Sequence, residues 1–243
     1  MKPSPFIASV DPNQQFDPDR HVPFGDIFVA KNMSPLQDSL DAITQGAGLP
    51  DRADQGWVVL RGVDVGILVH LILDADDIEF SEGSGICATR LSVGEETDDK
   101  IDVYFGNDMA WIGASRLVIP GLISLLCENA AQYEVEVEDL TNQVARIAVM
   151  GPDSLKLLHA LGLPPNSLEK LGKSIGIEVI QEPVLVCRSD FAGPHGYEFI
   201  IPNEPFNMIL AVICSWGVRL ELNLLPVGIE PIWQLSSEGE SSD

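Results

Sequence analysis

Two groups of carboxylates lie where their chemistry would matter. Glu198 opens the apolar stretch "YEFIIP", and the acidic run "EETDDKIDVY" leads into an earlier apolar stretch. A carboxylate beside buried surface is costly unless it is satisfied, so Glu198 requires a protein group, a water molecule or a ligand as its partner. A carboxylate accepts two N–H bonds from the flat edge of an amino-pyrimidine, which makes a heterocycle one candidate ligand. For the acidic run, the alternative is a solvated loop.

The elements expected around these carboxylates form an internal repeat. The stretches "WVVLRGVDVGILVHLI" (57–72) and "ARIAVMGPDSLKLLHAL" (145–161) each predict an apolar strand, a Gly-x-Asp turn and an amphipathic helix. A hairpin and a second helix follow each copy, at 100–130 and 183–217. Two copies of strand, helix, hairpin and helix predict an α+β fold, with mixed sheets and helices packed on one face.

The two Gly-x-Asp turns have a structural interpretation. Gly62 and Gly151 permit a sharp turn between strand and helix, and Asp64 and Asp153 are placed to cap the helices that follow. The repeat predicts that the two strand-to-helix units are structurally equivalent.

Composition limits the classes of partner. The chain has 14 Lys and Arg against 37 Asp and Glu, a net charge of -23, which disfavours binding to nucleic acid because phosphates would be repelled. The longest apolar segments are shorter than the roughly 20 residues that cross a bilayer, and the N-terminus does not resemble a secretory signal. We therefore expect no membrane partner and a cytoplasmic location. The four cysteines, which lie far apart, are expected to be reduced and mostly buried.

The chain divides by composition into three parts. Residues 1–54 are rich in Pro, Asp, Gln and Gly and are expected to form an irregular lead-in, with one helix that Ser34 could cap. Residues 55–235 form the expected folded domain, and 236–243 a disordered acidic tail. No dinucleotide, phosphate-loop, hydrolase or clustered His/Cys motif occurs, so no metal site is expected.

Two segments carry a family resemblance. The segment "ENAAQYEVEVEDLTNQVARIAVMGPDSLKLLHALG" (128–162) resembles part of the glycine-cleavage T-protein, the tetrahydrofolate-dependent aminomethyltransferase, which reads V-E-V-x-D, a strand, then Q-G-P and a helix. The segment "RSDFAGPHGYEFIIP" resembles the family pattern R-T-G-Y-T-G-E-D-G-Y-E, with Arg188, Tyr197 and Glu198 on matching positions. The resemblance implies a duplicated folate-binding fold with tetrahydrofolate as cofactor. It also implies that Glu198 holds the pterin edge, with Tyr197 and Arg188 as further cofactor-binding residues.

The sequence also departs from the family pattern. The family's catalytic aspartate lies in G-G-x-x-D-D-x-x-V-Y, and here "GEETDDKIDVY" makes Asp98 and Asp99 the candidate catalytic residues. The family's V-N-A-S becomes "IGAS", with Gly113 in place of the amide, and its G-A-R-D-T-L-R becomes "EPIWQLS", with Ile232 in place of the arginine. The family continues into a C-terminal barrel domain, which we expect to be absent here.

Two main functional hypotheses follow, and a third is a demethylase-type relative, in which folate accepts a methyl group from another substrate. In the first, the chain is a divergent tetrahydrofolate-binding protein that transfers or accepts a one-carbon unit, with Asp98 or Asp99 acting on the reacting amine and Glu198 orienting the ring. In the second, it is a non-catalytic folate-fold module that acts as an interaction or regulatory partner of another protein chain. The replaced arginine and the missing barrel favour the second hypothesis, and the retained Gly-Tyr-Glu favours the first.

Overall fold

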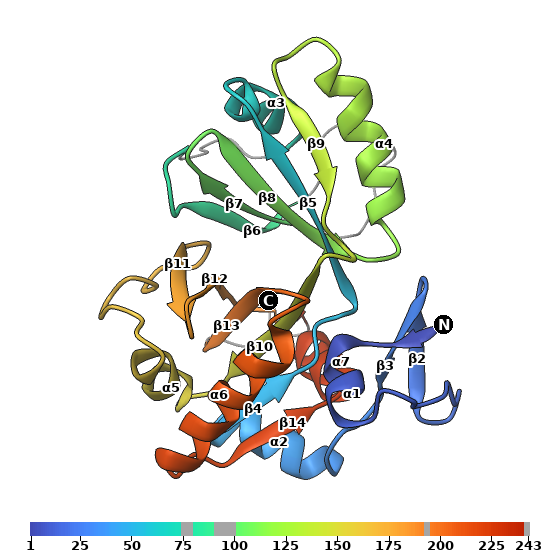
Figure 1. Ribbon diagram of the computed structural model, residues 1–243, viewed down its shortest axis with the longest axis vertical. Helices are drawn as coiled ribbons and strands as arrows, with labels where there is room; N and C mark the ends of the chain where they lie inside the picture. Colours follow the sequence, from blue (N-terminus) through green and yellow to red (C-terminus); the bar gives the residue numbers. More distant parts are fainter. Residues whose placement is uncertain (74–79, 90–100, 192–194, 241–243) are drawn as a thin grey trace.

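The structure, a computed structural model, describes residues 1–73, 80–89, 101–191 and 195–240. Within them, two larger sheets lie one above the other, and a small three-stranded sheet lies beside the lower one (Figure 1). The expected α+β architecture is confirmed, and the described residues form no barrel domain.

The upper sheet is built by the first copy of the repeat. Its five strands have the order β6-β7-β8-β5-β9, and helices α3 and α4 cover its outer face (Figure 1). The elements are β5 (Gln55–Arg61), α3 (Val65–Ile72), β6 (Gly85–Thr89), β7 (Ile101–Gly106), β8 (Met109–Ser115), α4 (Ile119–Ala130) and β9 (Glu136–Asp139).

The lower sheet is built mainly by the second copy. Its six strands have the order β11-β12-β13-β10-β4-β14, with α5 and α6 on the outer face. The elements are β10 (Val144–Met150), α5 (Ser154–Ala160), β11 (Ser174–Val179), β12 (Glu182–Ser189), β13 (Gly196–Pro202), α6 (Phe206–Arg219) and β14 (Leu224–Val227). In each copy the first strand pairs antiparallel with the second strand of the hairpin, β5 with β8 and β10 with β13, as the repeat requires.

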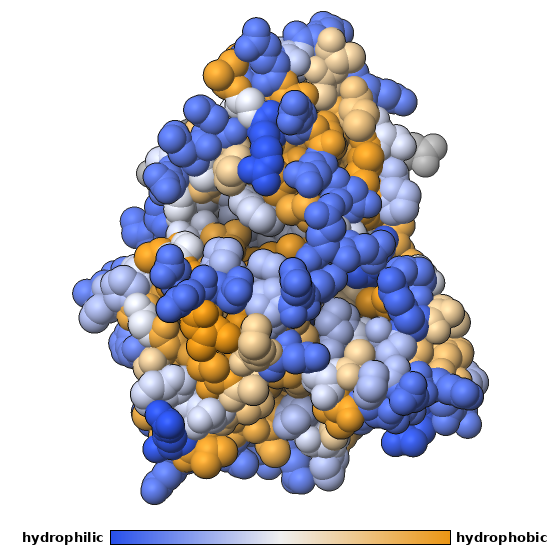
Figure 2. Space-filling model, viewed as in Figure 1, coloured by the Kyte–Doolittle hydropathy of each residue, from blue (hydrophilic) through white to orange (hydrophobic). Residues whose placement is uncertain are grey.

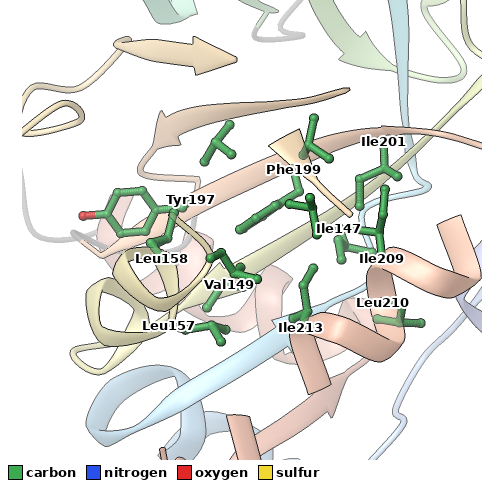
Figure 3. Packing of buried hydrophobic residues seen from close by; sticks show 14 of the residues in the cluster. Ile147, Val149, Leu157, Leu158, Tyr197, Phe199, Ile201, Ile209, Leu210 and Ile213 are labelled. Carbon is green, nitrogen blue, oxygen red and sulfur yellow. The ribbon is translucent and has the colours of Figure 1, made fainter. Parts of the chain in front are cut away.

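Strand alternation gives each sheet two apolar faces. On β13, Tyr197, Phe199 and Ile201 point toward α5 and α6 and form the lower core with β10 and both helices (Figure 3). Ile200 points the other way, toward the upper sheet, where it packs with Trp57 and other residues of both sheets. Two helix-covered cores and one sheet-to-sheet contact therefore organise the molecule.

The N-terminal segment is more regular than its composition predicts. It forms β1 (Lys2–Pro3), α1 (Pro5–Val10), β2 (His21–Phe24), β3 (Ile27–Ala30), α2 (Leu36–Gln45) and β4 (Ala47–Pro50). Strand β4 is inserted between β10 and β14 and is fully buried. Its sequence, "AGLP", is too short and too rich in Gly and Pro to read as a strand. The Ser34 side chain donates to the Pro226 carbonyl at 2.9 Å and does not cap α2.

Three further expectations differ from the structure. Helix α7 (Ile229–Glu240) extends into the segment expected to be a disordered tail. Asp64 and Asp153 occupy the N-cap positions of α3 and α5 but make no side-chain cap bond; the Asp64 carboxylate accepts from the Glu134 amide at 3.0 Å instead. All four cysteines are free, but Cys127 and Cys214 are exposed, because they lie on the outer faces of α4 and α6.

The surface reflects the composition. Figure 2 shows hydrophilic residues over much of this face, interrupted by hydrophobic groups over α4 and around α5 and α6. Within the described part of the chain, no helix combines the length and the apolar character needed to span a bilayer.

Candidate functional site

The facing sides of the two sheets bring five polar or aromatic residues together. Glu198 lies on β13, Arg146 on the adjacent strand β10, and Asp102 and Trp57 on β7 and β5 of the upper sheet; Arg52 lies in the connection from β4 to β5. We call this group the sheet junction. Neighbouring residues of Glu198 and Arg146 on their strands point into the lower core, so alternation directs both side chains to the opposite face.

A chain of ion pairs crosses the sheet junction. The Arg146 Nη2 atom contacts the Glu198 Oε2 atom and lies 3.3 Å from the Asp102 Oδ2 atom. The Arg52 Nη1 atom lies 3.2 Å from the Glu198 Oε1 atom. The Glu198 side chain is 0% exposed and that of Arg146 is 2% exposed. The partner that Glu198 requires is therefore, in this structure, a pair of guanidinium groups.

Burial and charge act against each other on these groups. Burial raises the pKa of the Glu198 carboxyl, and the charges of Arg146 and Arg52 offset part of that rise. Burial lowers the pKa of Arg146, but the nearby carboxylates of Glu198 and Asp102 outweigh it and raise that pKa. The charged form of Glu198 thus depends on the charges of Arg146 and Arg52, and that of Arg146 depends on Glu198 and Asp102, as expected for a buried ion pair.

Several polar atoms of the sheet junction have no hydrogen-bond partner among the described residues. They are Arg146 Nε and Nη1, Trp57 Nε1, Arg52 Nη1 and Glu198 Oε1. The 3.2 Å contact between Arg52 and Glu198 is an ion pair whose direction does not make it a hydrogen bond. Buried polar groups are normally bonded, so five such atoms at one place indicate unused capacity to bind a polar ligand or water.

Aromatic rings enclose the two arginines. The Arg146 guanidinium lies 4.7 Å from the Trp57 ring centroid, and the Arg52 guanidinium 3.7 Å from that of Phe191. Trp57 in turn contacts Tyr104, with ring centroids 6.0 Å apart. Flat rings and flat guanidinium groups form surfaces against which a planar heterocycle could stack.

A sequence model of the family described as "GCVT N-terminal domain" matches residues 13–240. The chain belongs to this family. An aminomethyltransferase of Lysinibacillus sphaericus (strain C3-41) is 25% identical over 210 residues, 86% of this chain and 57% of the relative. An aminomethyltransferase of Mycobacterium bovis (strain ATCC BAA-935 / AF2122/97) is 28% identical over 184 residues, 73% of this chain and 49% of the relative. The chain thus spans about half the length of the curated relatives it matches.

Solved structures agree on the fold. The glycine cleavage system aminomethyltransferase T from Bartonella henselae matches with a TM-score of 0.78 and 18% identity, over 98% of this chain and 63% of that chain. A chain of the heterotetrameric sarcosine oxidase from Corynebacterium sp. U-96 matches with a TM-score of 0.55 and 16% identity, over 75% of this chain and 91% of that chain. At such identities the likeness shows a common fold.

The residues predicted from the GCVT pattern do not all lie together. Tyr197 points away from Glu198 into the lower core, where Figure 3 shows it near Leu158. The Arg188 guanidinium lies 4.8 Å from the Tyr197 ring centroid and donates to the Gly196 carbonyl at 2.9 Å, at the mouth of the hairpin. Asp98 and Asp99 lie outside the described residues. The roles of these residues in binding and catalysis stay predictions.

The two departures from the GCVT pattern have clear structural consequences. Ile232 is buried against Ile43 and Val227, so its position is part of an apolar cluster. A Cβ atom added to Gly113 would lie 3.0 Å from Arg146 Nη1 and 3.1 Å from the Trp57 ring. The guanidinium of Arg146 therefore occupies the space next to Gly113.

Sequence reasoning did not single out Arg146, Arg52 or Trp57, and within the acidic run it named Asp98 and Asp99 but not Asp102. A usable signal existed for Arg146, since a charged residue within "VARIAVM" poses the same question as Glu198 within "YEFIIP". Their pairing could not be inferred, because it depends on strand register within the lower sheet and on how the two sheets stack. In the described residues, no group of three or more His, Cys, Asp or Glu side chains could hold a metal ion.

Asp51, next to Arg52, should make stability depend on pH. It is buried, and its carboxylate accepts from the Ser4 hydroxyl at 2.5 Å and from the Ala53 amide at 3.0 Å. Burial raises its pKa from 3.8 to about 6. Because the folded-state pKa lies above the unfolded one, its stabilising contribution is complete below pH 3.8 and is lost as the pH rises through about 6.

We expect Asp51→Asn to remove this dependence. The free energy of unfolding of the variant minus that of wild type should rise by on the order of 1 to 3 kcal/mol from pH 4 to pH 7, because only wild type loses stability over this range. Urea denaturation at a series of pH values measures both free energies. Asp26→Asn, at an exposed carboxylate, is the control and should run parallel to wild type. If the Asp51→Asn curve also runs parallel, Asp51 does not have a raised pKa.

Proposed function

We propose that this protein binds a reduced folate, tetrahydrofolate, at the sheet junction. Glu198 accepts the N–H groups of the pterin edge, and Trp57 supplies an aromatic surface beside it. The observation that carries the proposal is the cluster of buried polar atoms that have no hydrogen-bond partner in the described part of the chain, one of which is Glu198 Oε1. It is supported by the Gly-Tyr-Glu match to the GCVT family and by relatives named aminomethyltransferase.

One-carbon transfer is the reaction that this proposal implies. Bound tetrahydrofolate would supply the nitrogen that carries or accepts the one-carbon unit. Asp98 or Asp99 would hold or deprotonate the reacting amine, and Glu198 would orient the ring. Arg188 and Tyr197 would act by fixing the hairpin from which Glu198 projects, since Arg188 on β12 contacts Gly196 and Tyr197 at the start of β13.

Calorimetric titration with tetrahydrofolate under reducing conditions tests the binding. We expect saturable heat at micromolar to millimolar ligand, and at least a roughly tenfold weaker affinity for Glu198→Gln, because a charge-assisted hydrogen bond contributes about 1.5 to 3 kcal/mol. Glu178→Gln, at an exposed position on β11, should bind as wild type does. Absence of heat from the wild-type protein at millimolar tetrahydrofolate would end the cofactor proposal and leave the family assignment intact.

A second candidate function is favoured by specific contacts. Glu198 already has two arginines, and the position of the family arginine is apolar, both of which suit a non-catalytic folate-fold module. Such a module would act as an interaction or regulatory partner, and the sarcosine oxidase relative is part of a heterotetramer. Failure to bind folate, together with co-purification with a second chain in a defined ratio, would select this function.

A further inference from the structure

The contact between Arg146 and Glu198 has an unusual setting. Arg146 lies within an apolar strand, is fully buried, and crosses from the lower sheet to reach Asp102 on the upper sheet. Residue 113 is glycine, and a Cβ added there would lie 3.0 Å from this Nη1 atom, which is closer than an ordinary van der Waals contact. Arg146, Gly113 and Glu198 therefore fit together as one unit built from three strands.

The donor groups of Arg146 match those of the proposed ligand. The edge of a pterin carries an exocyclic amino group and a ring N–H on either side of one carbon, which is a guanidine fragment fixed in a ring. The Arg146 guanidinium is the same fragment in open form, and in this structure it meets Glu198 through Nη2 alone, at Oε2. A pterin N–H group that binds Glu198 at Oε2 would therefore have to replace the Arg146 Nη2 group.

We propose that Arg146 is an internal substitute for the amino-pyrimidine edge of the pterin and competes with it for Glu198. This inference rests on the proposed function, because it assumes that Glu198 is the pterin carboxylate. Folate binds only after Arg146 leaves Glu198 and turns fully to Asp102, its second carboxylate at 3.3 Å. Arg52 remains beside Oε1 at 3.2 Å and compensates the charge of Glu198 in both states.

This competition lowers the apparent affinity for tetrahydrofolate, because only those molecules in which Arg146 has left Glu198 can bind it. Arg146→Met keeps the length of the side chain but removes the fork, so it should bind tetrahydrofolate at least about tenfold more tightly than wild type, by calorimetry. Arg146→Lys keeps the charge but offers a point donor, and it should give an intermediate affinity. Arg61→Met, at an exposed ion pair on β5, is the matched control and should bind as wild type does.

The outcomes separate this inference from the proposed function, provided that circular dichroism shows folded variants. Equal affinity of wild type and both Arg146 variants would overturn the proposed competition between Arg146 and the pterin, and would leave folate binding intact. Binding by Arg146→Met alone would support the proposed competition and show that Arg146 prevents the wild-type protein from binding tetrahydrofolate. Absence of binding by all folded variants would overturn both proposals.

A second experiment needs no folate and covers the case in which Arg146→Met does not fold. Gly113→Ala should lower the melting temperature of the wild-type protein, because the added Cβ would lie 3.0 Å from Arg146 Nη1 and 3.1 Å from the Trp57 ring. In the Arg146→Lys background, which has no Nη1 atom and keeps only the Trp57 contact, the same change should lower the melting temperature by clearly less. An equal decrease in both backgrounds would show that Gly113 does not exist to accommodate Arg146, and would overturn the inference.

Discussion

Glu198→Gln is expected to lower the free energy of unfolding by about 3 to 5 kcal/mol, whether or not folate is present. The reason is that the Arg146 and Arg52 guanidinium groups would remain buried after their shared carboxylate is neutralised. Urea denaturation at pH 7 measures the change.

Glu178→Gln provides the control for this experiment. Its side chain is exposed on β11, so its effect should stay within about 0.5 kcal/mol. A loss of less than about 1 kcal/mol for Glu198→Gln would mean that the carboxylate is not paired with both arginines in solution. A large loss is compatible with folate binding, since the same carboxylate can stabilise the free protein and accept a ligand.

Gly62→Ala and Gly151→Ala are expected to be the most destabilising single-methyl changes in the repeat, each costing about 3 kcal/mol or more. Gly62 has φ +140°, and an added Cβ would lie 1.9 Å from the Glu134 carbonyl oxygen. Gly151 has φ +110°, and an added Cβ would lie 2.5 Å from the Gly46 carbonyl oxygen. Both the backbone conformation and the contact with another backbone segment exclude a side chain.

Gly121→Ala is the matched control for both changes. Gly121 is exposed in the first turn of α4, with nothing within 4 Å of an added Cβ, so alanine should stabilise the protein by a few tenths to about 1 kcal/mol. Thermal and urea unfolding of the three variants measure the effects. Tolerance of alanine at one repeat glycine but not at the other would show that the two turns are not equivalent.

Local features of the fold could be predicted from the sequence because they depend on short-range rules. Apolar alternation, a glycine that allows a positive φ, and turn residues between apolar runs act over a few residues, so both strand-to-helix units and both hairpins were predictable. The same locality explains the errors. A strand as short as β4 is stabilised by its neighbours β10 and β14, which lie far from it in sequence.

The sequence by itself determined that Glu198 needs a partner; the tertiary structure decided which one. Burial of a carboxylate within "YEFIIP" follows from its apolar neighbours, and its cost follows from desolvation. The identity of the partner depends on strand register, which brings Arg146 beside Glu198, and on the stacking of two sheets, which brings Asp102 and Trp57 to the same place. These distances are set by contacts between residues 44 to 89 positions apart, and no local pattern encodes them.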